Sequence, residues 1–309
     1  MNTASGSKRA GMGAFKYELL LLLVSIIWGS TFVAQQIGMK KGLGPMTFNA
    51  LRFALGSLSL IPVIFWRKKN LSTPAAETKF PYAGSICAGV FLFGAAAFQQ
   101  IGLQYTSAAN SGFITSFYIL FVPLLGMFFG RRIRKSLWVA ILICLVGFYL
   151  LSVTGNFQVS KGDFLTLICA VIWAGHILVI DHIAIKGDSI QIACVQFAVC
   201  ALLSALCSFL FEHCSLTQVK AASMAIAYAG FVSVGIAYTL QVVCQKYCPP
   251  ASAAIIMSLE SVFAALFGYL VLKQTLTPRA ILGCFLILLG VLIAQLTPLI
   301  RNREFSNKV

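Results

Sequence analysis

The chain has 309 residues, of which 59% are hydrophobic and 10% charged, and its mean hydropathy is +0.91. A soluble domain carries roughly a quarter charged residues, so this composition excludes a water-soluble globular protein and indicates an integral membrane protein. The formal net charge of +15 does not indicate nucleic-acid binding, because the basic residues lie in short clusters between apolar runs, as they do in membrane-protein loops.

Apolar runs long enough to cross a bilayer occur ten times along the chain. We predict spans at Glu18–Gly38, Met46–Trp66, Phe80–Leu103, Ala108–Phe129, Arg134–Val153, Asp163–Ala184, Ile190–Phe211, Ala221–Val243, Pro250–Leu272 and Arg279–Leu299. Each should be a helix, because a helix satisfies its own backbone hydrogen bonds inside the hydrocarbon core. The predicted fold class is therefore an all-α membrane protein with ten transmembrane helices.

The distribution of Lys and Arg predicts how these spans are oriented. With both termini in the cytoplasm, clusters such as Arg67-Lys68-Lys69 and Arg131-Arg132 lie on the cytoplasmic side, where basic loops are favoured. Most of the other basic residues then fall on that side as well. We expect a multi-pass protein of the plasma membrane, which in a bacterium is the inner membrane, with both termini cytoplasmic.

A polar linker divides the chain into an N-terminal half, residues 1–154, and a C-terminal half, residues 155–309. Equivalent residues recur in the two halves: Gln99 and Gln241, Tyr105 and Tyr247, and Gly126 and Gly268 are each 142 positions apart, and Trp28 and Trp173 are 145 apart. Five spans in each half is an odd number, so the second half must enter the membrane from the opposite face. This predicts two inverted five-helix repeats, with a substrate near the midplane between them.

Several motifs resemble those of a known family of ten-helix transporters. They are WGSTF at 28–32, the pair Arg52-Phe53, YTSAANSGFI at 105–114, PPASAAIIMSLESVFAALFGYLVL at 249–272, and the glycines of Gly283–Gly290. Together they are similar to the drug/metabolite transporter superfamily, specifically its EamA-type permeases, in which each half would be one repeat. The resemblance implies movement of small metabolites across the plasma membrane, most often amino acids and related compounds, with export the expected direction.

The chain departs from the family pattern at two kinds of position. Many members have Leu-Gly-Glu at the ends of the fourth and ninth helices, where this chain has Phe129-Gly130-Arg131 and Leu272-Lys273-Gln274. Members also commonly have Glu-Pro in the ninth helix, where this chain has Glu260-Ser261. Any role that the family assigns to those groups does not carry over here.

Polar and aromatic side chains near the middle of the spans are the candidate substrate-binding residues. Trp28, Tyr118, Trp173 and Glu260 each lie about eleven residues into a span. Tryptophan is usual at membrane interfaces, so a tryptophan at the midplane either lines a wet cavity or packs in the protein core. The full predicted set is Trp28, Thr31, Gln99, Gln100, Tyr118, Trp173, His176, Tyr238 and Gln241. The glutamines are alternatively helix-to-helix hydrogen-bonding groups.

Three ionisable side chains within the spans suggest more specific roles. Glu260 and His176 are candidates for carrying a coupling proton, because an ionisable group inside the membrane is a functional hypothesis by default. The alternative for each is a hydrogen bond that fixes helix packing. Arg52 is a candidate site for an anionic group of the substrate, or else it forms a structural bond to a neighbouring segment.

These features favour a secondary transporter that works by alternating access, because the sequence has no P-loop for ATP. The alternatives are a facilitative, channel-like permease and an intramembrane enzyme. The enzyme is disfavoured, because HExxH and G-x-S-x-G are missing from the sequence and Glu260 has no second carboxylate at its depth. The ten cysteines form no metal-binding motif, so we expect no metal and no other cofactor. The expected partners are a small-molecule substrate and the lipid bilayer, with the protein a monomer or a homodimer.

Overall fold

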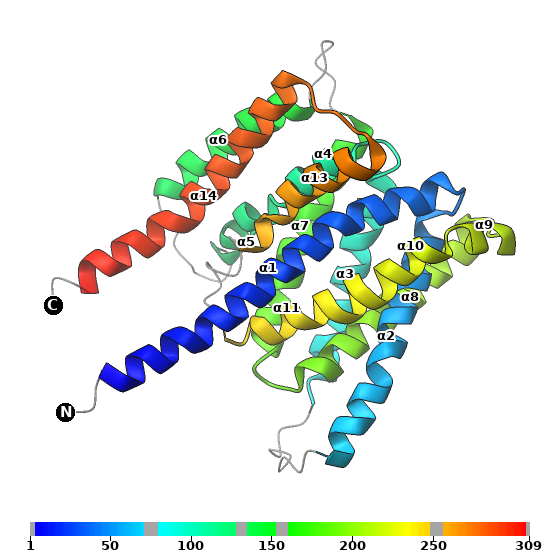
Figure 1. The fold of residues 1–309 in the computed structure, drawn as a ribbon, viewed down its shortest axis with the longest axis horizontal. Helices are drawn as coiled ribbons and strands as arrows, with labels where there is room; N and C mark the ends of the chain where they lie inside the picture. Colours follow the sequence, from blue (N-terminus) through cyan, green and yellow to red (C-terminus); the bar gives the residue numbers. More distant parts are fainter. Residues whose placement is uncertain (1–3, 71–79, 128–134, 153–159, 248–255, 307–309) are drawn as a thin grey trace.

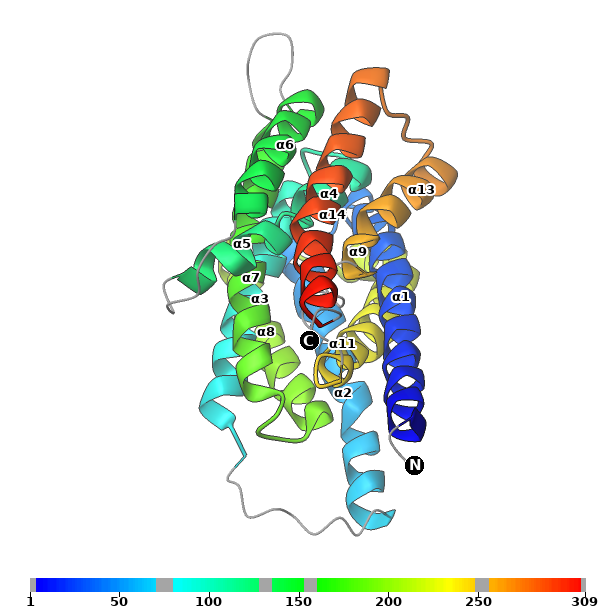
Figure 2. The same ribbon diagram turned by 90° about the vertical axis from the view of Figure 1, so that its left-hand side faces the viewer.

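The computed structural model describes residues 4–70, 80–127, 135–152, 160–247 and 256–306. Within these residues every regular element is a helix, and the helices form a bundle (Figures 1 and 2). The proposed division of the chain at residue 154, the start of the predicted ninth span and the residues Phe129-Gly130-Arg131 lie outside the described residues.

The first half contributes α1 (Ala4–Lys40), α2 (Pro45–Asn70), α3 (Tyr82–Gly102), α4 (Ala108–Thr115), α5 (Tyr118–Gly126) and α6 (Lys135–Ser152). The second half contributes α7 (Lys161–Ile183), α8 (Ser189–Phe211), α9 (Leu216–Ala221), α10 (Ser223–Ala227), the π-helix η2 (Tyr228–Tyr238), α11 (Thr239–Cys244), α13 (Glu260–Leu272) and α14 (Pro278–Ser306). Polar side chains cap several of these helices. Asp188, for example, accepts hydrogen bonds from the backbone N–H groups of Ile190 and Gln191 at the start of α8.

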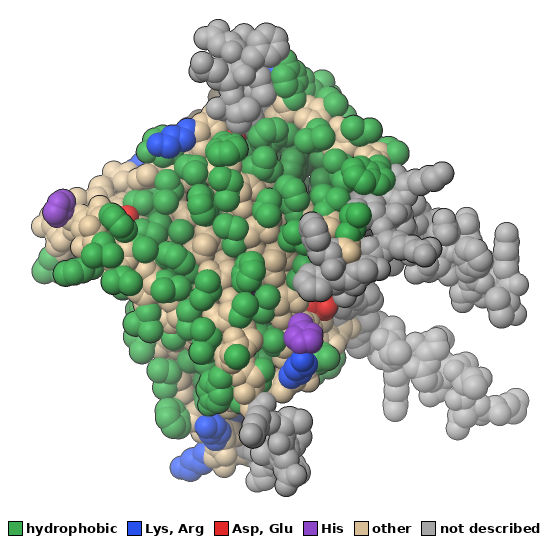
Figure 3. Space-filling model, turned by 180° about the vertical axis from the view of Figure 1, so that it is seen from behind, with side chains coloured by type: hydrophobic (Ala, Val, Ile, Leu, Met, Phe, Trp, Pro, Cys, Tyr) green, Lys and Arg blue, Asp and Glu red, His purple; other side chains and the backbone are tan. Residues whose placement is uncertain are grey.

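Seven segments of the described chain are long and apolar enough to cross a membrane: Lys16–Lys40, Pro45–Asn70, Tyr82–Gly102, Ala108–Gly126, Lys161–Ile183, Ser189–Phe211 and Ser223–Cys244. Three shorter apolar helices are Trp138–Leu151, Ile256–Leu272 and Pro278–Gly290. Each predicted span overlaps one of these segments, although ten membrane crossings remain a prediction. Apolar side chains cover the middle of the face in Figure 3, with Lys and Arg toward its edges. This is the surface that a bilayer requires.

The helices of the two halves pack against each other in reciprocal pairs. α2 lies along α8, and α6 lies along α14. α3 packs against α7 and α8, while η2 packs against α1 and α2. α1 packs along α13, while α7 packs along α4 and α5. Glycines allow some of these close approaches: a Cβ on Gly147 of α6 would lie 2.8 Å from the carbonyl oxygen of Gly283 in α14.

Three helical segments depart from the regular α-helical hydrogen-bonding pattern. Phe117 N–H bonds to the carbonyl of Ile114, and Leu259 N–H bonds to that of Ile256, so both backbones tighten to i→i−3 hydrogen bonds just before α5 and α13. In the helix formed by α10, η2 and α11, eleven residues instead widen into a π-helix. π-helical segments often lie at functional sites. All three irregularities lie next to the cavity described below.

Candidate functional site

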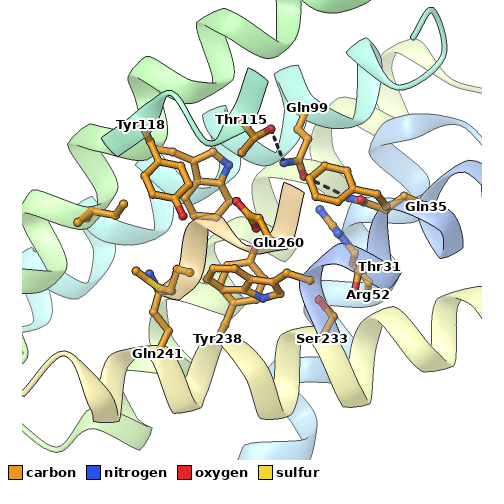
Figure 4. A pocket seen from close by; sticks show the side chains of 15 residues that line it. Thr31, Gln35, Arg52, Gln99, Thr115, Tyr118, Ser233, Tyr238, Gln241 and Glu260 are labelled. Carbon is orange, nitrogen blue, oxygen red and sulfur yellow. Dashed lines mark hydrogen bonds between the residues drawn. The ribbon is translucent and has the colours of Figure 1, made fainter. Parts of the chain in front are cut away.

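A buried cavity lies at the centre of the bundle, where helices from both halves meet (Figure 4). About 450 Å³ of space not filled by atoms lies between its lining side chains. Its lining residues are Trp28, Thr31, Phe32, Gln35, Arg52, Gln99, Thr115, Tyr118, Trp173, Ile177, Ser233, Tyr238, Gln241, Met257 and Glu260. They come from α1, α2, α3, the α4–α5 segment, α7, the η2–α11 segment and the helix containing α13.

Aromatic rings form one wall of the cavity. The Tyr238 ring lies between two indoles: its centroid is 4.7 Å from that of Trp28 at an interplanar angle of 49°, and 5.7 Å from that of Trp173 at 18°. Phe53 and Phe197 support Tyr238 from behind, with centroids 6.1 Å away in each case. Such a cluster offers a planar, apolar surface with hydroxyl and indole N–H groups at its edges.

Amide and hydroxyl groups lie together at another side of the cavity, beside Arg52. Gln99 Nε2 donates to Thr115 Oγ1 at 3.3 Å, and Gln35 Nε2 lies 3.3 Å from Gln99 Oε1 (Figure 4). Turned so that its oxygen faces Arg52, the Gln35 amide instead accepts hydrogen bonds from Nη1 at 2.7 Å and Nη2 at 3.2 Å. We assign this second orientation, because the first one brings amide and guanidinium donors face to face.

Tyr118 and Glu260 face the same cavity from the two tightened helix segments. Tyr118 is the first residue of α5 and Glu260 the first residue of α13, and they are 142 positions apart. The preceding lining residues, Thr115 and Met257, have the same separation. The two halves therefore present equivalent backbone irregularities to one cavity.

Several polar atoms around the cavity have no hydrogen-bond partner within the described part of the protein. They are Trp28 Nε1, Arg52 Nε and Gln241 Oε1. Buried polar groups are nearly always paired with protein or with water. Their concentration around one cavity indicates a site that a polar ligand or ordered water completes.

Two residues of the predicted substrate-binding set do not line the cavity. His176 is buried and its Nε2 lies 2.8 Å from Gln196 Oε1, while its ring stands edge-on to Trp173 with centroids 5.1 Å apart. Gln100 is buried beside the cavity lining. The hydrogen bond to Gln196 is the structural alternative considered for His176, although it does not test a role in coupling.

Six lining residues were not singled out from the sequence: Phe32, Gln35, Thr115, Ile177, Ser233 and Met257. Gln35 follows Thr31 by one helical turn, so the face shared by Trp28 and Thr31 was a signal for it. Thr115 had a comparable signal, one turn before Tyr118. Ser233 had no such spacing signal, because the nearest predicted residue, Tyr238, is five positions away. Residues five apart share a face in a π-helix but not in an α-helix.

A partly buried amide network joins α1, the start of α4 and the end of α13 near one end of the bundle. Gln36 Nε2 donates to the carbonyl of Thr106 at 2.7 Å, and Gln274 Nε2 donates to Gln36 Oε1 at 2.7 Å. Gln274 Oε1 accepts from the backbone N–H of Ala108 at 3.1 Å. The side-chain amide of Gln274 lets it donate and accept at once.

Other contacts join helices at the opposite end of the bundle. Arg67 of α2 forms an ion pair with Asp188 at the start of α8, with a distance of 2.9 Å. Lys246 Nζ donates to the carbonyl of Gly187 at 3.2 Å. Tyr17 and Tyr247 stack with ring centroids 4.4 Å apart. The cavity thus lies between two sets of contacts, one at each end.

Comparison with known proteins identifies the family. The model of the EamA-like transporter family matches the chain twice, over residues 15–153 and 160–296. An uncharacterized transporter of Archaeoglobus fulgidus is 32% identical over 280 residues, covering 90% of this chain and 85% of the relative. The uncharacterized transporter YoaV of Bacillus subtilis is 24% identical over 290 residues, covering 91% and 97%. A crystal structure of a protein at 22% identity has a similar fold, with a TM-score of 0.67 over 91% of this chain and 96% of that one. The chain therefore belongs to the EamA-like transporter family and is a multi-pass membrane protein.

Proposed function

We propose that this transporter is a secondary carrier that exports small metabolites, amino acids or related compounds, by alternating access. The observation that carries the proposal is the central cavity: it is buried among apolar helices, and it gathers polar atoms that have no partner among the described residues. A structural core would pair those atoms. A carrier leaves them for its cargo, which enters from one side of the membrane and leaves to the other.

Two inverted repeats, residues 1–154 and 155–309, provide the mechanical basis for such a carrier. Three observations support them. The family model matches each half separately. Contacts between helices also correspond in the two halves: the packing of α3 against α7 is matched by the packing of η2 against α1. The tightened segments before Tyr118 and Glu260 are 142 positions apart. Discontinuous helices at the midplane are typical of transporters with this architecture.

The contacts at the two ends of the bundle are then the gates. In the predicted topology, the Gln36–Gln274 network lies at the outer end and the Arg67–Asp188 ion pair at the inner end. Opening to the outside requires the outer network to separate, and opening to the inside requires the inner contacts to do so. Both termini are cytoplasmic in this proposal, and the protein lies in the plasma membrane.

The proposal is tested with purified protein. A panel of amino acids and related metabolites is first screened for ligands that raise the melting temperature, because a ligand that binds only the folded state stabilises it. Each hit is then measured in proteoliposomes by counterflow, in which an internal unlabelled pool drives uptake of external labelled compound. Saturable counterflow supports a carrier. Flux that rises linearly with concentration and lacks counterflow would indicate the channel-like alternative.

A further inference from the structure

Arg52 is an isolated buried cation at the central cavity. Its side chain is 1% exposed and it lines the cavity. The guanidinium carbon lies 4.8 Å from the centroid of the Phe53 ring and 5.9 Å from that of Phe48. These two rings hold the guanidinium by cation–π contact and exclude water from that side.

Arg52 has fewer hydrogen-bond partners than a buried guanidinium requires. The group carries five N–H donors. The Gln35 oxygen accepts two of them, and Nε has no partner in the described part of the chain. The ion pair found among the described residues, Arg67–Asp188, involves a different arginine. A buried cation without a counter-charge is strongly unfavourable inside a membrane.

We propose that the missing counter-charge is the carboxylate of the cargo, and that Arg52 binds it. The inference rests on the proposed transport function and specifies the chemistry of the cargo. A planar carboxylate matches the fork of a guanidinium in two parallel hydrogen bonds. Gln99 and Thr115, beside Gln35, supply further polar groups at the same end of the cavity. The aromatic wall then faces the remainder of the cargo.

The charges of the cavity favour a single negative charge on the cargo. Arg52 is the one basic residue among the described residues that line the cavity. Its single charge balances one carboxylate, whereas a phosphate with two charges would keep one charge unbalanced in surroundings that screen charge poorly.

The second half offers no equivalent cation. The position 144 residues after Arg52 is Gln196, whose amide oxygen lies 2.8 Å from His176 Nε2 outside the cavity lining. The cavity therefore has a cation on the side of the first half only, even though the helices of the two halves correspond in pairs. The carboxylate has one place to bind, and the cargo has one preferred orientation, with its carboxylate toward α2.

Matched probes test this subsite in the purified full-length protein. Benzoate, benzamide and benzylamine share a ring and differ in the head group, as L-phenylalanine and L-phenylalaninamide differ in the carboxylate. We expect benzoate and L-phenylalanine to raise the melting temperature, and the other three to bind at least about tenfold more weakly. Equal binding of benzoate and benzamide would overturn the proposal, as would the lack of any benzoate response at tens of millimolar.

Substitutions locate the site. Arg52→Gln should weaken benzoate binding at least about tenfold, whereas the control Arg279→Gln, at an exposed position at the start of α14, should bind as the wild type does. Gln35→Glu supplies an internal carboxylate next to Arg52 and should block benzoate binding while preserving the fold. This second variant keeps the test decisive if Arg52→Gln is unstable. Benzoate binding that survives in a folded Gln35→Glu protein would also refute the subsite.

The subsite and the transport function fail in different ways. Counterflow of a cargo that lacks a carboxylate would refute the subsite and leave the carrier intact. The converse result is selective, Arg52-dependent binding of benzoate while none of the carboxylate-bearing compounds that bind shows counterflow. That result would support the subsite and refute the carrier.

Discussion

Gly29 lies where α1 crosses α13, directly beside the cavity, and its replacement by alanine gives a sharp test of the structure. A Cβ at this position would lie 2.4 Å from Phe263 Cβ, 2.8 Å from the backbone nitrogen of Ala264 and 2.8 Å from the carbonyl oxygen of Glu260. Ordinary contacts are 3.4–4 Å, so the two helices must separate by roughly 1 Å. Two of the three atoms belong to the backbone, so side-chain rotation does not relieve the overlap.

The expected effect follows from two opposing contributions. Overpacking of this kind costs about 1–3 kcal/mol of folding free energy. Alanine regains about 0.5–1 kcal/mol over glycine inside a helix. Gly29→Ala should therefore be destabilised, by up to about 2.5 kcal/mol, and its melting temperature in detergent should fall by a few degrees. The separation also moves Glu260 away from Trp28, so ligand affinity should fall as well.

Gly94→Ala is the matched control, because its Cβ would meet Ile172 Cγ2 at 3.4 Å and Cδ1 at 3.6 Å, which are ordinary contacts. It gains the same helix preference without the overlap, so its melting temperature should equal or exceed that of the wild type. Thermal unfolding of both variants is followed side by side, together with binding of the best ligand. If Gly29→Ala is as stable as Gly94→Ala and binds equally well, the close crossing of α1 and α13 is wrong.

Three further predictions concern topology, coupling and binding. A reporter fused after residue 154 should lie outside the cell while reporters at both termini lie in the cytoplasm; a cytoplasmic signal at 154 would contradict inverted repeats. If Glu260 or His176 carries a coupling proton, Glu260→Gln or His176→Gln should abolish the dependence of counterflow on a pH gradient in folded protein, and unchanged dependence in both variants would exclude both residues. Trp28→Ala and Trp173→Ala should each weaken ligand affinity clearly and lower protein yield to a smaller extent. Each ring offers the ligand a stacking surface worth about 0.5–1.5 kcal/mol beyond its buried area. Unchanged affinity in both would assign the indoles to packing alone.

The helices and part of the cavity lining could be predicted from the sequence because both depend on local patterns. Apolar runs of membrane length mark the spans, and depth within a span placed Trp28 and Glu260 at the same level. Whether such residues face one another depends on helix rotation, which depth does not reveal. Gln35 lies on the face of α1 that Trp28 and Thr31 share, which the sequence indicates, but its contact with Arg52 of α2 could not be predicted from either helix alone.

The helix irregularities could not be predicted, because no local residue requires them. The segment around Phe117 contains neither glycine nor proline at the point where the backbone tightens, and the same holds at Leu259. The π-helix packs against α1 and α2, and the residues of η2 alone give no local signal for its wider turns. The pairing of His176 with Gln196 likewise joins two helices whose rotations had to be known first.

The unpaired polar atoms around the cavity have a consequence for selectivity. A pocket with an apolar wall distinguishes poorly between compounds that differ by one methylene: the preference for one over the other is only about 10- to 200-fold. A pocket whose own donors and acceptors stay unpaired rejects a compound that lacks the matching group far more strongly, because that compound displaces water and leaves the groups buried without partners. Here these groups include the indole nitrogen of Trp28 and the amide oxygen of Gln241. The protein should therefore tolerate variation in the size of a cargo's apolar part and be strict about its polar groups.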